Sequence, residues 1–314
     1  MNTILILLLF LIGIVLIVKG GDYFVDASVW IAEVLRIPKF LIGATVVSFA
    51  TTLPELLVSV IAAIEEKPDM ASGNAIGSVT ANIGIIMSIA IICMPMIIKR
   101  TELFAKGVIM ILSAVILFYF SSDFAISYVE AIILILVFLI FMGENIVSAK
   151  KLRDNSIEAP QTSTKETITN IIKFIIGIAA IVVGADLLVD NGSELARIIG
   201  IPESIIAVTL VAVGTSLPEL VTTVTAIIKK QSALSVGNII GANIIDLTLI
   251  MPICSIIYHG NIPVSMQTAS LDIPICIMIM AVSVIPALIF ERLRRWQGIV
   301  MISIYAIYLT ALFT

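Results

Sequence analysis

Two short acidic motifs inside apolar stretches are the residues of this chain best suited to chemistry. The sequence LPEL occurs at 53–56, where it contains Glu55, and again at 217–220, where it contains Glu219. Their carboxylates, with neighbouring hydroxyls and backbone carbonyls, offer the oxygen ligands that hard cations such as Na⁺, Ca²⁺ and Mg²⁺ prefer. The motifs contain no Cys or His, which disfavours zinc and copper. The predicted chemistry is therefore the binding of a hard cation.

Each glutamate is accompanied by further oxygen groups at helical spacing. Thr51 precedes Glu55 by four residues, and Thr215 precedes Glu219 by four, so each hydroxyl shares a helix face with its carboxylate. The proline of each motif has no N–H, and its ring displaces the carbonyl four residues earlier from its helical hydrogen bond. Inside a bilayer such carbonyls persist only where a neighbour, water or a bound cation satisfies them. All of these groups add oxygen atoms to one region.

A polar stripe follows each motif at a spacing of four residues. The stripes consist of Asn74, Ser78 and Asn82 in the first case and of Asn238, Ala242 and Asp246 in the second. Glycines beside them, at 73, 77, 237 and 241, allow helices in a membrane to approach closely. We therefore expect the stripes and the LPEL motifs to converge.

The acidic residues at this point need a countercharge. A charged residue at the centre of a bilayer costs roughly 2.5–3.5 kcal/mol even on the lenient insertion scale, so Glu55, Glu219 and Asp246 together imply about 7–10 kcal/mol. No Lys or Arg lies at matching depth in the helices that carry them. The countercharge is most simply a cation or a proton. Hydrogen bonding between helices is the alternative role, above all for Asp246 and Asn82.

The composition shows which elements must position these residues. The chain has 314 residues, of which 60% are hydrophobic and 13% charged, and its mean hydropathy is +1.18, which excludes a water-soluble fold. We predict an all-α polytopic membrane protein with ten transmembrane helices. The spans are roughly 2–33, 40–64, 71–97, 102–121, 124–148, 168–195, 203–228, 232–257, 268–290 and 293–313. The net charge of −4, with basic residues only in short clusters, argues against nucleic acid as a partner.

Basic residues predict the orientation of these spans. Loops on one side hold Arg36, Lys39, Lys99, Arg100, Lys106, Lys150, Lys151, Arg153, Lys165, Lys229, Lys230, Arg292, Arg294 and Arg295, and those on the other hold only Lys67 and Arg197. Because cytoplasmic loops are enriched in Lys and Arg, both termini should be extracellular, in a multi-pass protein of the cell membrane. The polar segment 149–167 is then a cytoplasmic linker between residues 1–148 and 168–314.

These two parts repeat one another. One constant shift in residue number, which takes Glu55 to Glu219, also pairs GNAIG at 73–77 with GNIIG at 237–241, Ile37-Pro38 with Ile201-Pro202, Gly13 with Gly177, and Asp22 with Asp186. We call this shift the repeat offset. Each part has five predicted spans, and an odd number makes the second part enter the bilayer in the opposite sense. The chain is therefore predicted to be two inverted five-helix repeats, the organisation of secondary transporters whose site lies near the bilayer midplane.

The paired motifs resemble those of a known family. GATVVSFATTLPE and AVTLVAVGTSLPE, followed by GNAIGSVTANIG and GNIIGANIIDL, are similar to the two alpha-repeats of the cation/calcium antiporter superfamily, in particular its prokaryotic sodium/calcium exchangers without a cytosolic regulatory domain. The resemblance implies that Glu55 and Glu219 are the central calcium ligands, helped by oxygens of Thr51 and Thr215. It implies sodium ligands at Thr52, Ser216, Ser78, Asn82 and Asp246 and at the carbonyls of Ser48 and Ala212.

The function predicted from these observations is Na⁺/Ca²⁺ antiport by alternating access. Its partners are Ca²⁺, Na⁺ and the lipid bilayer, and neither a cofactor nor a protein partner is expected. Exchange of H⁺ for Ca²⁺ or another divalent cation is the alternative, with the same glutamates carrying protons. An intramembrane hydrolase is disfavoured because the chain lacks a GxGD motif and a serine/histidine pair. A channel is disfavoured because a cage of full charges holds ions too tightly for fast conduction.

One departure from the family pattern leads to a test. Position 242 is alanine where the second repeat of the family carries a serine, so one sodium site lacks a hydroxyl. Ala242→Ser should therefore raise the affinity for sodium, measured as the Na⁺ dependence of ⁴⁵Ca²⁺ uptake into proteoliposomes. An unchanged Na⁺ dependence would show that position 242 contributes no ligand.

Overall fold

The computed structural model describes residues 3–154, 162–199 and 214–312, and nearly all of them are helical. The first part of the chain forms α1 (Thr3–Leu35), α2 (Lys39–Ile42), η1 (Gly43–Val47), α3 (Ser48–Thr51), α4 (Leu53–Ile64), α5 (Pro68–Ala81), η2 (Asn82–Met87), α6 (Ser88–Cys93), β1 (Met96–Ile97), α7 (Arg100–Phe120), η3 (Ser121–Asp123), β2 (Ala125–Ser127) and α8 (Tyr128–Asp154). The second part forms α9 (Thr164–Ile198), α12 (Leu217–Ile228), α13 (Ser232–Ile245), η5 (Asp246–Ile250), α14 (Met251–Ile257), β3 (Asn261–Pro263), η6 (Thr268–Asp272), α15 (Ile273–Phe290), β4 (Arg292–Leu293) and α16 (Arg295–Leu312).

The described helices agree with a multi-pass membrane protein. Eight of them are long and apolar enough to cross a bilayer, and a ninth span is possible if the pair Lys39–Thr51 and Leu53–Ile64, bent by 45°, counts as one. The predicted span 203–228 lies partly outside the described residues, as does Ile201-Pro202; its described portion is α12. The helical membrane fold is confirmed, and the total of ten spans stays a prediction.

Breaks in the helices occur at the predicted prolines and at places that the sequence did not reveal. Pro54 and Pro218 stand in the first turns of α4 and α12, where a missing N–H costs least. Four π-helical segments, η1, η2, η5 and η6, were not predicted. Each such segment widens the helix locally, which re-aims side chains, and π-turns are frequent at functional sites.

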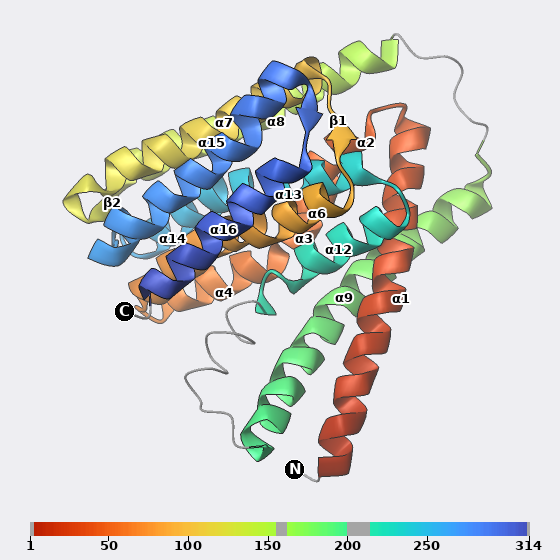
Figure 1. Ribbon diagram of the computed structural model, residues 1–314, viewed down its shortest axis with the longest axis horizontal. Coiled ribbons are helices and arrows are strands. Elements are labelled where there is room, and N and C mark those ends of the chain that lie inside the picture. The colour runs from red at the N-terminus through yellow and green to blue at the C-terminus, as the bar shows by residue number, and fades with distance from the viewer. Residues whose placement is uncertain (1–2, 155–161, 200–213, 313–314) are drawn as a thin grey trace.

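Helices α1 and α9 lie side by side and extend away from the block that the other helices form (Figure 1). Their contact is made by two glycine pairs, Gly13 with Gly184 and Gly20 with Gly177. A Cβ atom at Gly13 would lie 2.9 Å from the carbonyl of Gly184, and one at Gly20 would lie 2.8 Å from the carbonyl of Gly177. The two helices therefore touch backbone to backbone, which glycine alone permits. The repeat offset converts one of these pairs into the other.

Two short antiparallel ribbons join the first part of the chain to the second. Strand β1 pairs with β4, with Met96 opposite Leu293, and β2 pairs with β3, with Ile126 opposite Ile262. Each ribbon thus takes one strand from each part. The sequence analysis missed these strands because two or three residues are too few to show an alternating pattern.

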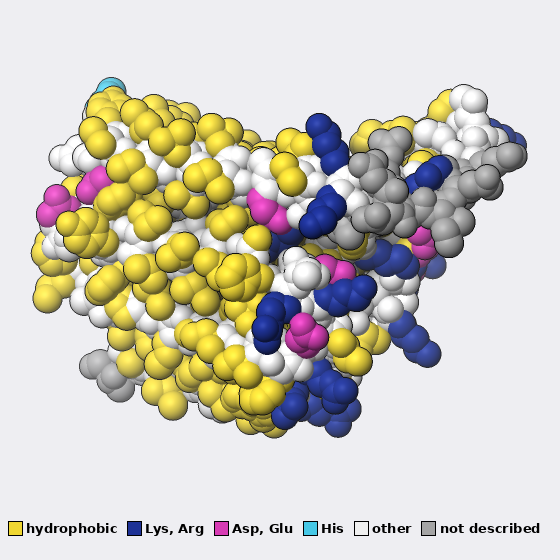
Figure 2. Space-filling model, turned by 90° about the horizontal axis from the view of Figure 1, so that it is seen from above, with side chains coloured by type: hydrophobic (Ala, Val, Ile, Leu, Met, Phe, Trp, Pro, Cys, Tyr) yellow, Lys and Arg dark blue, Asp and Glu magenta, His cyan; other side chains and the backbone are white. Residues whose placement is uncertain are grey.

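The outer surface suits a lipid environment. Apolar side chains cover most of the face in Figure 2, while Lys and Arg gather at one end of it. Large apolar residues such as Leu57, Val129 and Ile140 are more than half exposed. A soluble monomer rarely exposes contiguous apolar surface on this scale, so the exposed residues are in their expected solvent, the acyl chains.

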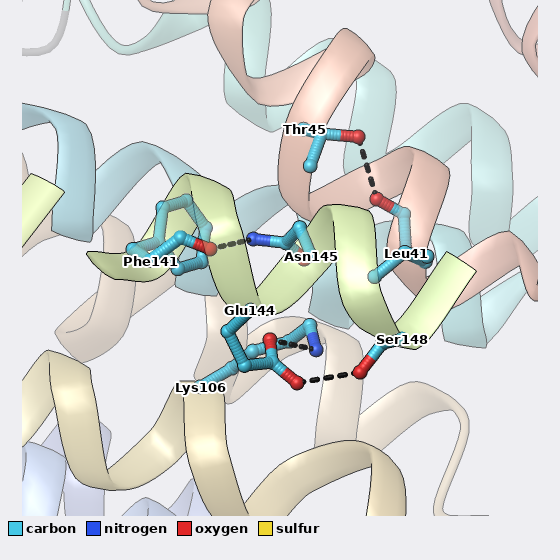
Figure 3. A network of polar contacts seen from close by, with 7 residues as sticks. All are labelled: Leu41, Thr45, Lys106, Phe141, Glu144, Asn145 and Ser148. Carbon is cyan, nitrogen blue, oxygen red and sulfur yellow. Dashed lines mark hydrogen bonds and ion pairs between the residues drawn. The ribbon is translucent and has the colours of Figure 1, made fainter. Parts of the chain in front are cut away.

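Lys106 corrects one detail of the charge analysis. It was counted among the loop residues, but it lies inside α7 with only 2% of its side chain exposed, and its Nζ is 2.7 Å from Glu144 Oε2 on α8. Ser148 Oγ donates to the other carboxylate oxygen of Glu144 at 2.6 Å. Figure 3 shows this network beside Asn145, whose amide donates to the carbonyl of Phe141. Lys106 therefore ties α7 to α8 and is no evidence for orientation.

This ion pair predicts a stability effect. Lys106→Met should lower the free energy of unfolding by about 1–3 kcal/mol, because it leaves Glu144 charged and without its partner. The expected loss is below that of a fully buried pair because the Glu144 side chain remains 22% exposed. The measurement is the thermal unfolding midpoint in detergent. The double variant Lys106→Met with Glu144→Gln should recover most of the loss; a single variant as stable as the wild type would contradict the prediction.

Candidate functional site

Glu55 and Glu219 lie at matching places in two helices. Each is in the first turn of its helix, α4 or α12, one residue after the proline. The amide-rich N-terminus of a helix carries partial positive charge, which favours an acid there. Both side chains are fully buried, and the two carboxyl groups are close enough to affect one another electrostatically. The structure thus brings together two residues from opposite halves of the sequence.

Asp246 joins this pair. It begins η5 and is fully buried, and its carboxyl interacts electrostatically with those of Glu55 and Glu219. Its counterpart Asn82 begins η2 in the same way. Within the described residues, no carboxyl oxygen of Glu55, Glu219 or Asp246 has a hydrogen-bond partner. The side-chain amide of Asn82 also has none, at either its nitrogen or its oxygen. Buried polar atoms are normally paired, so a concentration of unpaired ones at one point marks a place where a ligand or water belongs.

Two hydroxyl–amide contacts connect the two parts of the chain across this site. Thr51 Oγ1 donates to Asn238 Oδ1 at 3.2 Å, and Thr215 Oγ1 donates to Asn74 Oδ1 at 3.4 Å. The repeat offset converts one contact into the other. The threonine hydroxyl that precedes each LPEL motif is therefore hydrogen-bonded to the polar stripe of the opposite part of the chain.

The remaining predicted residues, with one exception, are buried on segments that adjoin the three acids or Asn82 in the chain. Ser48 begins α3, and its carbonyl accepts the backbone N–H and the hydroxyl of Thr52. Thr52 and Ser216 are the N-cap residues of α4 and α12, and both are buried. Ser78 is buried one turn before Asn82 on α5. Ala212 lies outside the described residues.

The donor set is made of oxygen and is acidic. No group of three His, Cys, Asp or Glu side chains in metal-holding geometry occurs in the described part of the chain. The acidic groups of the site are the neighbouring carboxyls of Glu55 and Glu219 and the carboxyl of Asp246, which interacts with both. The other polar groups are neutral hydroxyls and amides. Such a set favours hard cations over zinc or copper.

Ser59 and Thr223 were missed by the sequence analysis. Each is fully buried and follows its glutamate by four residues. Ser59 Oγ accepts a hydrogen bond from Asn74 Nδ2 at 2.9 Å. The sequence offered one signal for them, because a hydroxyl residue follows the glutamate by four positions in both LPEL segments. It was overlooked because a serine inside a helix usually bonds to its own backbone.

Comparison with known proteins identifies the family. The family model described as sodium/calcium exchanger protein matches residues 5–147 and 169–314. This chain belongs to the sodium/calcium exchanger family. The sodium/calcium exchanger MaX1 of Methanosarcina acetivorans is 33% identical over 353 residues, with 98% of each chain covered. The inner membrane protein YrbG of Escherichia coli is 31% identical, over 81% of this chain and 80% of YrbG.

Solved structures of one exchanger share the fold. The sodium-calcium exchanger NCX_Mj soaked with 2.5 mM Na⁺ and 1 mM Sr²⁺ superposes with a TM-score of 0.84 at 29% identity, over 99% of both chains. The same protein soaked without Na⁺ and Ca²⁺ gives a TM-score of 0.82. The family predicted from the paired motifs is therefore confirmed, and with it membership of a class of transporters and not of enzymes.

The buried carboxyls predict an effect on stability. In buffer with a chelator and without sodium, Glu55→Gln and Glu219→Gln should each raise the free energy of unfolding, on the order of 1–3 kcal/mol, because each removes a charge from an apolar interior. The gain should shrink in acidic buffer, where a protonated acid has no charge to lose. Thermal unfolding at acidic and alkaline pH measures it.

Glu65→Gln is the matched control, because Glu65 caps the far end of α4 and its side chain is 52% exposed. It should leave stability nearly unchanged. Glutamine variants at 55 and 219 that are no more stable than the wild type in alkaline buffer would contradict the expected cost of burying the charges.

Proposed function

We propose that this protein is a secondary antiporter that exchanges Na⁺ for Ca²⁺ by alternating access to a site near the bilayer midplane. The observation that carries the proposal is the meeting of Glu55, Glu219 and Asp246 in one buried place without hydrogen-bond partners among the described residues. A cation there supplies the missing countercharge. One divalent ion and two monovalent ions balance the same two carboxylates, so the two kinds of ion compete, and competition for one site is the physical basis of exchange.

The proposed ligand assignment is the one that the resemblance of the paired motifs implies. We assign the central calcium site to Glu55 and Glu219 with oxygens of Thr51 and Thr215. We assign the flanking sodium sites to Ser48, Thr52, Ser78, Asn82, Ala212, Ser216 and Asp246, of which Ala212 lies outside the described residues. Within this set only the carbonyls of Ser48 and Ala212 contribute backbone oxygen.

We further propose that the fold consists of ten transmembrane helices in two inverted repeats, residues 1–148 and 168–314, joined by the linker 149–167. Three pairs of contacts support this fold. Within each pair, shifting the residue numbers of one contact by the repeat offset, forward for the residue in the first part and backward for the residue in the second, gives the residues of the other contact. For the ribbons the agreement is to within a few residues. They are the glycine contacts of α1 with α9, the ribbons β1–β4 and β2–β3, and the two threonine–asparagine hydrogen bonds. An internal two-fold relation produces such pairs. Helices α8 and α9 extend into the proposed linker, to Asp154 and from Thr164.

The proposed location is the cell membrane, with both termini outside. Even without Lys106, the basic residues remain strongly concentrated on one predicted side. The gathering of Lys and Arg at one end of the molecule in Figure 2 supports this assignment.

Removal of the charges tests the ion site. Glu55→Gln or Glu219→Gln should lower Ca²⁺ transport by about 100-fold or more, because loss of one anionic ligand from a buried site costs roughly 3–5 kcal/mol. Asp246→Asn should change the dependence on Na⁺ more than the binding of Ca²⁺. The measurement is ⁴⁵Ca²⁺ uptake into proteoliposomes driven by an outward Na⁺ gradient, with Glu65→Gln as the active control.

The driving ion is tested in the same vesicles. Uptake should follow the Na⁺ gradient and saturate with Ca²⁺. Uptake that ignores sodium and follows a proton gradient would replace the proposal with H⁺/Ca²⁺ exchange. Normal uptake by either glutamine variant would refute the central site.

A further inference from the structure

Ser59 is a buried polar residue close in sequence to the site, and it has no role in the proposed ligand set. It is fully buried on α4, one turn after Glu55. Other hydroxyls in the helices, such as those of Ser28 and Thr80, donate to the carbonyl four residues earlier in their own helix. The Ser59 hydroxyl instead accepts a hydrogen bond from the side-chain amide of Asn74 on α5, at 2.9 Å. It therefore acts on the neighbouring helix.

The contacts of Asn74 fix the direction of its amide. Asn74 Nδ2 lies 2.9 Å from Ser59 Oγ and 3.2 Å from the backbone carbonyl of Glu55. A carbonyl oxygen only accepts hydrogen bonds, so the NH₂ group must face α4. The amide oxygen consequently faces Thr215, whose Oγ1 is 3.4 Å away. Because an amide oxygen also only accepts, Thr215 is the donor.

This chain of donors determines what Thr215 presents to the site. A hydroxyl offers a neighbour either its proton or its lone pairs. When the proton of Thr215 is given to Asn74, the lone pairs are left for other partners. A cation is bound by lone pairs, so the fixed amide prepares Thr215 to act as a ligand.

The equivalent residues in the second part of the chain, Asn238 and Thr223, do not form the equivalent of the hydrogen bond that joins Asn74 to Ser59. Asn238 Oδ1 accepts from Thr51, as its counterpart does from Thr215. In the part of the chain that is described, however, neither Asn238 Nδ2 nor Thr223 Oγ1 has a partner. Thr51 Oγ1 also lies 3.4 Å from a second acceptor, the carbonyl of Ser48. The proton of Thr51 therefore has more than one acceptor, and the amide that receives it has no anchor among the described residues.

We propose that Ser59 is a positioning residue of the cation site: through Asn74 it holds the hydroxyl of Thr215 in the orientation that accepts a cation. The inference rests on the proposed function and names a residue outside the ligand set. It also makes the two repeats unequal, because Thr223, the counterpart of Ser59, lacks this connection.

The test compares Ser59→Ala with its mirror variant Thr223→Ala. Ser59→Ala removes one of the two anchors of the Asn74 amide, so the KM for Ca²⁺ should rise about 2- to 12-fold, the range for loss of one neutral hydrogen bond. The maximal rate should change little, because the charges are intact. Thr223→Ala should change KM by less than about twofold, since its hydroxyl has no bond to lose. Ser59→Thr keeps the hydroxyl and should restore the wild-type KM.

A double-mutant cycle separates positioning from a purely structural effect. If Ser59 acts through Thr215, then Ser59→Ala adds little to KM once Thr215→Val has removed that hydroxyl. Effects on KM that multiply would show that Ser59 does not act through Thr215, whereas a purely structural role would lower the amount of folded protein and the maximal rate without a specific change in KM.

The possible results are distinguishable. An unchanged KM in Ser59→Ala, an equal rise in Thr223→Ala, or independent effects in the cycle would each overturn the inference while leaving the proposed function intact. Full transport by Glu55→Gln, or no Ca²⁺ transport by the wild type, would overturn the proposed function itself. A rise in KM confined to Ser59→Ala and abolished by Thr215→Val supports both.

Discussion

The structure depends on one unfavourable interaction, the confinement of Glu55, Glu219 and Asp246 within reach of one another in an apolar interior. Like charges repel strongly where water cannot screen them. The surrounding elements reduce this cost in part. Each glutamate lies in the first turn of its helix, α4 or α12, so the positive ends of both helices face the site. Under the proposed function an arriving cation removes the rest of this cost, so the repulsion that weakens the ion-free protein would provide the affinity for the ion.

The scaffold around this site is made of contacts that join the two parts of the chain. Thr51 and Thr215 each reach the polar stripe of the opposite part. Gly237 on α13 fits against the backbone carbonyl of Phe40, where a side chain would collide with it. Gly73 and Gly77 have no such neighbour among the described residues, although the sequence pattern suggested one. The close approach is thus seen where α13 meets the first repeat.

Sequence reasoning reached the parts of the molecule that depend on residue type and spacing. The prolines at 54 and 218 marked the helix breaks, and the acids without basic partners marked the place where three buried carboxyls meet. The long apolar runs indicated the eight long apolar helices of the described residues. Features that depend on a distant partner were missed: Lys106 looked like a loop residue because Glu144 is 38 positions away. The π-helical starts at Asn82 and Asp246 were also missed, because one extra residue per turn leaves no mark in the hydrophobic pattern.

The two ribbons have a consequence for how the protein is made. A chain leaves the ribosome from its N-terminus, so β1 and β2 are made before their partners β3 and β4 have been synthesised. The edge of β2 stays unpaired until residues 261–263 have been synthesised, and the edge of β1 stays unpaired until residues 292–293, just before α16, have been synthesised. The first part of the chain therefore completes its two ribbons only after residues 261–263 and 292–293 have been made. Final assembly is a late event, and a chain truncated before Leu293 would leave β1 without its partner.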